Sequence, residues 1–137
     1  MKQVFADTLY WVASITPGDP WHAPTLWVVA ALGAVHLVTT EEVLVEFLSA
    51  YAGRGAYLRS KALQTVRAIL STVSVTVRPQ THESFMTGLE VYASRADKAY
   101  SLVDCISMHT MRQMGLTEVL TNDHHFTQEG FTILITR

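Results

Sequence analysis

Hydrophobic and polar positions follow two different periods along this chain. Short apolar runs, typical of buried strands, recur between longer stretches whose apolar residues fall three and four positions apart, as in amphipathic helices. The stretch from residue 43 to residue 51 has the helical spacing most clearly, with apolar side chains at Val43, Leu44, Phe47, Leu48 and Tyr51. The pattern therefore predicts strands that alternate with helices.

The predicted elements fill most of the chain. Strands are expected over residues 3–6, 35–38, 74–77, 118–121 and 131–136. Helices are expected from residue 9 onward, and over residues 22–32, 39–52, 57–70, 81–95 and 101–114. This order is typical of an α/β protein, which we expect to be a three-layer α/β/α sandwich around a mainly parallel sheet of about five strands.

Local signals set the predicted helix ends. Thr39 stands three residues before Glu42, which predicts a capping box at the start of one helix. Gly33 and Gly115 are expected to end two others. Neither an internal repeat nor a linker interrupts the chain, so we expect one domain over residues 1–137.

Composition narrows the class of protein. Hydrophobic residues make up 49% of the 137 residues and charged residues 16%, which is typical of a folded domain with a filled core. The net charge of −2 gives no support for strong non-specific binding to nucleic acid. No apolar run is long enough to predict a membrane span, and the single Cys105 excludes an internal disulfide. We therefore expect a cytoplasmic protein.

Four acidic residues stand at separate joints of the chain, each beside an apolar run: Asp7, Glu46, Asp104 and Asp123. Asp7 and Asp123 each follow a predicted strand, and the helices that carry Glu46 and Asp104 begin near the same edge of the sheet. Ligand sites of such sheets lie beyond the carboxyl ends of the strands. Four carboxylates that meet there repel one another unless a divalent cation lies between them.

Each acid also has a purely structural interpretation. Asp7 can cap the helix that follows it, and Asp104 completes a capping box with Ser101. Asp123 can be a turn residue, because aspartate is common in turns. Glu46 falls on the polar side of its helix, where a solvated glutamate is ordinary. The metal hypothesis therefore depends on the set and its order.

The set resembles the PIN-domain family in four segments. These are Val4-Phe5-Ala6-Asp7, the stretch from Thr39 to Glu46-Phe47-Leu48, Ser101-Leu102-Val103-Asp104-Cys105, and Thr121-Asn122-Asp123-His124-His125-Phe126. They occur in the family's order over essentially the full length. The resemblance implies a metal-dependent endoribonuclease in which Asp7, Glu46, Asp104 and Asp123 hold Mg²⁺ or Mn²⁺ and hydrolyse phosphodiester bonds of RNA.

The small size also resembles the toxin component of bacterial toxin–antitoxin pairs. That resemblance implies an antitoxin protein as partner, RNA as substrate, and a homodimer. Two alternatives stay open. One is a catalytically idle binding module with the same fold, and the other is a receiver-type signalling domain, although Thr8 stands where a receiver needs a second acid.

Other candidates are weaker. Asp97 either supports the site or, more simply, is a loop residue beside Lys98. The pair His124-His125 lacks the i, i+4 spacing of helical zinc ligands. The basic side chains of Arg54, Arg59, Lys61 and Arg67 form either a local RNA-binding strip or a solvated helix face.

Overall fold

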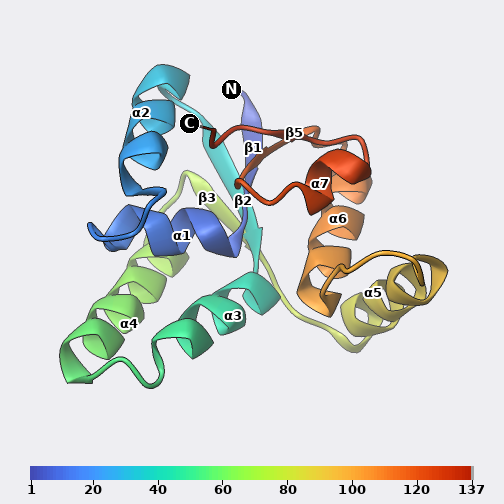
Figure 1. Ribbon diagram of the computed structural model, residues 1–137, viewed down its shortest axis with the longest axis horizontal. Coiled ribbons are helices and arrows are strands. Elements are labelled where there is room, and N and C mark those ends of the chain that lie inside the picture. Colours follow the sequence, from blue (N-terminus) through green and yellow to red (C-terminus); the bar gives the residue numbers. More distant parts are fainter. Residues whose placement is uncertain (137) are drawn as a thin grey trace.

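The computed structural model describes residues 1–136 and contains one parallel sheet of five strands in the order β3-β2-β1-β4-β5 (Figure 1). The strands are Gln3–Ala6 (β1), His36–Thr40 (β2), Val75–Arg78 (β3), Glu118–Leu120 (β4) and Thr132–Ile133 (β5). All four neighbouring pairs are parallel, as the alternation of strands and helices predicts. A receiver-type domain has the strand order 2-1-3-4-5, so this topology excludes that alternative.

Helices cover both faces of the sheet. In Figure 1, Thr8–Ile15 (α1), His22–Leu32 (α2), Glu41–Tyr51 (α3) and Ala56–Ser71 (α4) lie on one side of the strands. His82–Ser94 (α5), Leu102–Met114 (α6) and His125–Gln128 (α7) lie on the other. The three-layer α/β/α sandwich expected from the sequence is therefore confirmed. None of the helices in residues 1–136 is long and apolar enough to cross a membrane.

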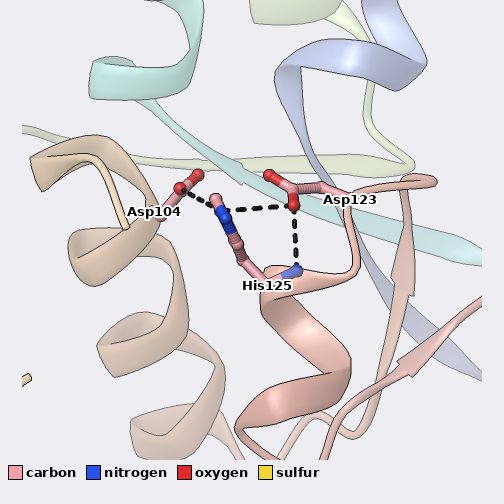
Figure 2. Close-up of side chains that lie close together, drawn as sticks. All are labelled: Asp104, Asp123 and His125. Atoms are coloured by element: carbon pink, nitrogen blue, oxygen red, sulfur yellow. Dashed lines mark hydrogen bonds and ion pairs between the residues drawn. The ribbon is translucent and has the colours of Figure 1, made fainter. Parts of the chain in front are cut away.

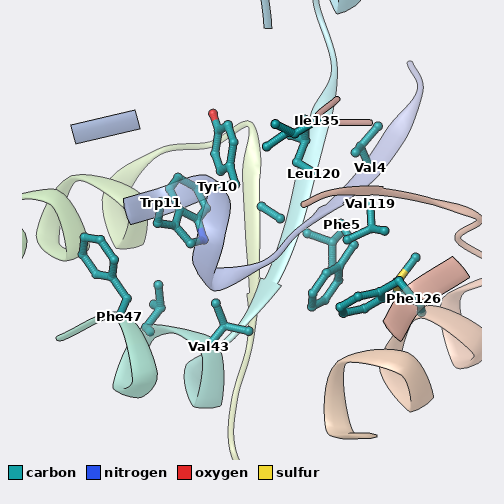
Figure 3. Packing of buried hydrophobic residues seen from close by; sticks show 14 of the residues in the cluster. Val4, Phe5, Tyr10, Trp11, Val43, Phe47, Val119, Leu120, Phe126 and Ile135 are labelled. Carbon is teal, nitrogen blue, oxygen red and sulfur yellow. The ribbon is translucent and has the colours of Figure 1, made fainter. Parts of the chain in front are cut away.

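The core forms where the central strands meet the apolar faces of the helices (Figure 3). The side chains of Phe5, Val38 and Val119 are fully buried on three adjacent strands. Strands buried on both faces are continuous apolar runs, which explains why these short segments were recognisable in the sequence. Phe47 of α3 and Phe126 of α7 close the core from opposite sides, and both are also fully buried.

Two predicted boundaries are wrong. Thr39 does not cap α3: it is the fourth residue of β2, and its hydroxyl donates to the Ala6 carbonyl oxygen at 2.9 Å. Thr40 is the cap, and its Oγ1 accepts from the Val43 amide at 3.1 Å. Both threonines have cap chemistry, so the sequence alone did not separate them. The strand predicted over residues 131–136 is also shorter, because only Thr132–Ile133 pairs with β4.

The order in which strands are added to the sheet switches sides at β1. The chain builds β2 and β3 on one side of β1 and then returns to place β4 and β5 on the other. At such a switch point the loops beyond two neighbouring strand ends diverge and leave a crevice. Here those two loops begin with Asp7 after β1 and Thr121 after β4.

Candidate active site

Asp7 lies at the bottom of the site, directly after β1. The residue is only 5% exposed, and burial raises the pKa of its carboxyl group from 3.8 to about 7. Hydrogen bonds from the Thr8 backbone and the Thr121 hydroxyl oppose that shift, and the negative charges of Asp104 and Glu46 add to it. The helix α1 receives no side-chain cap bond from Asp7. The structure therefore does not support the capping interpretation of Asp7.

Thr121 joins the ends of β1 and β4. Its hydroxyl donates to Asp7 Oδ2 at 2.9 Å, and the same oxygen accepts from the Asp123 amide at 3.1 Å. Thr121 is fully buried, so neither bond competes with water. The position of one candidate acid is thus tied to the backbone of another.

Glu46 approaches the site from α3. It is half-buried, and its Oε1 accepts a hydrogen bond from the hydroxyl of Thr8, in the first turn of α1. Glu42, one turn earlier, points elsewhere: its Oε2 accepts from the Ser84 hydroxyl at 2.7 Å and so links α3 to α5. The two glutamates, which the sequence pattern did not separate, have different surroundings.

Asp104, Asp123 and His125 form a compact cluster (Figure 2). One ligand atom from each lies within 4.8 Å of the other two. His125 Nδ1 lies 3.4 Å from Asp104 Oδ2 and 3.3 Å from Asp123 Oδ1. Its ring is tilted against Tyr100, with the ring centroids 5.3 Å apart.

The backbone holds both carboxylates of this cluster. Asp104 Oδ2 accepts from the Ser101 amide at 3.0 Å, and the Ser101 hydroxyl accepts from the Asp104 amide, so the predicted capping box is present. Asp123 Oδ1 accepts from the His125 amide at 2.9 Å. Burial raises the pKa of Asp104, and the charge of Asp123 adds to the rise. Asp104 is therefore a cap residue that also faces its acidic neighbours.

The four acids predicted from the sequence thus lie in one region but not in one tight group. Asp104 interacts electrostatically with Asp7 and with Asp123, while Glu46 interacts with Asp7. Among the described residues, only Asp104 and Asp123 share the 4.8 Å cluster. Asp97 lies outside it, with a side chain that is 79% exposed and 3.6 Å from Lys98.

Sequence reasoning missed His125 and Glu129. His125 was tested in the sequence only for the spacing of helical zinc ligands. The short helix α7, which turns the ring of His125 toward Asp104, was not predicted. The available signal was the position of His125, two residues after Asp123. Glu129, whose side chain is 7% exposed, binds Arg95 at 3.0 Å and Arg112 at 2.8 Å. These pairs, with a bond from Tyr100, lower the pKa of Glu129 to about 2. This network fixes α7, and with it His125, against α6.

The donor atoms suit a divalent cation. Carboxylate oxygens and an imidazole nitrogen are common ligands of Mg²⁺, Mn²⁺ and related ions. Asp7 is buried beside two further negative charges, and within residues 1–136 it has no ion pair with a basic side chain. A bound cation would supply the missing positive charge.

The sequence matches the PIN domain over residues 4–131. The chain belongs to the PIN-domain family. Curated relatives of this PIN domain include the 23S rRNA-specific endonuclease VapC20 of Mycobacterium tuberculosis, from strains CDC 1551 / Oshkosh and ATCC 25618 / H37Rv. Each is 30% identical over 130 residues, which cover 93% of this chain and 95% of the relative.

A solved structure agrees with this membership. The crystal structure of M. tuberculosis VapC20, described as a Sarcin-Ricin loop cleaving toxin, superposes with a TM-score of 0.83. The sequences are 26% identical, and the match covers 94% of this PIN domain and 96% of the other chain. The resemblance inferred from the four motifs is therefore confirmed at the level of family and fold.

Proposed function

We propose that this PIN domain is a metal-dependent endoribonuclease and the toxin component of a toxin–antitoxin pair. The observation that carries the proposal is that Asp7, Glu46, Asp104 and Asp123 lie in one region, where Asp7 interacts electrostatically with Glu46 and Asp104, and Asp104 with Asp123. The similarity to a protein named as an rRNA-specific endonuclease supports RNA as the substrate class.

Mg²⁺ or Mn²⁺ is the proposed cofactor, held by Asp104 and Asp123 with Asp7 and Glu46 beside them. When bound, such a cation lowers the pKa of a coordinated water and offsets the negative charge of a phosphodiester. The chain's own residues position the acids. Thr121 orients Asp7, and Thr8 orients Glu46 through the hydroxyl bonds described above.

The RNA strand needs positive charge beyond the site itself. Between Glu46 and Glu83 the chain contains no acidic residue but five basic ones: Arg54, Arg59, Lys61, Arg67 and Arg78. Within residues 1–136 none of these five forms an ion pair, whereas Lys2, Arg95, Lys98 and Arg112 all do. Arg59, Lys61 and Arg67 lie on α4, whereas Arg54 precedes it and Arg78 ends β3. We assign these basic side chains to the phosphate backbone of the substrate, because phosphate contacts supply a large share of the affinity for nucleic acid.

The partners follow from the same proposal. An antitoxin protein is expected to cover the site, and the homodimer implied by the family resemblance stays a prediction. Trp27 on α2 is 73% exposed, although large aromatic side chains are usually buried, and neighbouring Leu26 is 52% exposed. This apolar surface supports an interface with a partner chain. The cytoplasm is the proposed compartment, because RNA and its processing enzymes are found there.

Cleavage of RNA by matched variants tests the proposal. Asp104→Asn keeps the shape and the cap but removes a negative ligand, so the rate at saturating Mn²⁺ should fall by at least about 100-fold. Asp97→Asn is the matched control, since Asp97 is exposed and outside the site. If Asp104→Asn cleaves as fast as the wild type while remaining folded, the acids do not form the active site.

A further inference from the structure

His125 stands in an unusual position for a histidine at the edge of a carboxylate site. It is 31% exposed, and its Nδ1 faces one oxygen of Asp104 and one of Asp123 at nearly equal distances of 3.4 and 3.3 Å. Both distances exceed the range of about 2.7–3.2 Å for N–H···O hydrogen bonds. The nitrogen is therefore close to two acceptors without a good hydrogen bond to either.

Both separations are only a few tenths of an ångström longer than those between ligands of a shared ion. Two neighbouring ligands of an octahedral cation, each about 2.1 Å from the metal, lie about 3.0 Å apart. The three ligand atoms lie within 4.8 Å of one another, and Figure 2 shows the ring of His125 pointing into the space between the two carboxylates.

The three side chains are also held in place before any ion binds. Backbone amides of Ser101 and His125 fix the two carboxylates, as described above. Tyr100 packs against the ring of His125, and the Tyr100 hydroxyl donates to Glu129 at 2.9 Å. A side chain fixed on one face by an aromatic ring has few other orientations, which favours a built ligand over a solvated histidine.

We propose that His125 is a nitrogen ligand of the metal site, which therefore favours a divalent transition-metal ion such as Mn²⁺ or Co²⁺ over Mg²⁺. Mg²⁺ is a hard cation that prefers oxygen ligands, whereas imidazole suits transition metals. The proposal rests on the proposed metal-dependent function, and it adds to the carboxylate set a ligand that the sequence motif did not predict.

His125→Phe is the informative variant, because phenylalanine keeps a ring against Tyr100 but has no ligand atom. His124→Ala is the matched control, since His124 is the adjacent, exposed histidine and lies outside the cluster. Loss of a ligand should raise the dissociation constant for Co²⁺ by at least about 10-fold. Removing a residue that only supports a metal ligand already weakens metal binding by about 10-fold to 100-fold. The constant for Mg²⁺ should change little. Calorimetric titration of the metal-free protein measures both, and His125→Ala replaces the phenylalanine variant if that protein does not fold.

Electron spin-echo spectroscopy of bound Mn²⁺ gives a direct reading of the ligand. We expect ¹⁴N modulation in the wild type and in His124→Ala, and its loss in His125→Phe. A wild type that binds Mn²⁺ and cleaves RNA without ¹⁴N modulation, or modulation that persists in His125→Phe, overturns the proposed ligand and leaves the ribonuclease function standing. A wild type that cleaves RNA in EDTA and binds no Mn²⁺ overturns both.

Discussion

Replacing Asp7 with asparagine should stabilise the metal-free protein at neutral and alkaline pH. Asp7 is 5% exposed, and its pKa rises from 3.8 to about 7 in the folded state. Three pKa units at about 1.36 kcal/mol each correspond to about 4 kcal/mol. Asparagine keeps an oxygen that can accept the bond from Thr121 but has no charge to bury.

The pH dependence has a definite sign. Between pH 3.8 and about 7 the folded protein holds a proton on Asp7 that the unfolded chain has released, so this group makes the free energy of unfolding fall as pH rises. Above pH 7 the full penalty remains. The difference in unfolding free energy between Asp7→Asn and the wild type should therefore grow by up to about 4 kcal/mol from pH 4 to pH 8.

Urea unfolding in EDTA, followed by circular dichroism at both pH values, measures this difference. Asp97→Asn is the control, because an exposed aspartate should leave the pH dependence of stability unchanged. Excess Mn²⁺ should then stabilise the wild type by about 2.7 kcal/mol at 100 times the dissociation constant, and Asp7→Asn by less. If the difference in unfolding free energy between the wild type and Asp7→Asn is the same at pH 4 and pH 8, the raised pKa of a buried Asp7 is refuted.

Three further changes test neighbouring parts of the structure. Glu129→Gln should lower the free energy of unfolding by about 3 kcal/mol at pH 7. The loss should shrink as pH falls from 4.5 to about 2, because Glu129 of the wild type is then protonated and loses the same ion pairs. Gly88→Ala should cost about 1–3 kcal/mol in urea unfolding, because its Cβ would lie 2.4 Å from Ile106 Cγ1 where α5 packs on α6. Glu46→Gln should nearly abolish RNA cleavage with little change in melting temperature. Glu42→Gln should keep its cleavage rate and lose at most about 1 kcal/mol, because its amide oxygen still accepts from Ser84 but without the charge that strengthens the bond. Equal cleavage rates for the two glutamate variants would contradict the assignment of Glu46.

Much of the fold could be predicted because its signals are local. Val4 and Phe5 belong to an apolar run that is buried on both sides, and Ser101 and Asp104 form a capping box within four residues. Where two neighbouring residues had the same chemistry, as with Thr39 and Thr40, the choice depended on pairing with β1, which is not a local property.

The site was less predictable because its contacts are distant in sequence. The bond between Thr121 and Asp7 joins residues 114 positions apart, and no spacing rule indicates it. The sequence placed four acids near one edge of the sheet, but it did not indicate that Asp104 and Asp123 would form a cluster with His125. His125 enters the cluster on α7, a short helix whose C-cap residue, Glu129, pairs with Arg95 and Arg112 from distant parts of the sequence.

The most direct test of the ribonuclease assignment is a titration of the purified wild-type protein with Mn²⁺ from an EDTA-treated start. RNA cleavage and metal binding are measured on the same sample. The account predicts no cleavage without metal, and a cleavage rate that rises to half its maximum at the Mn²⁺ concentration that half-fills the site. Full cleavage in EDTA, or a filled site with no cleavage of any RNA, would contradict it.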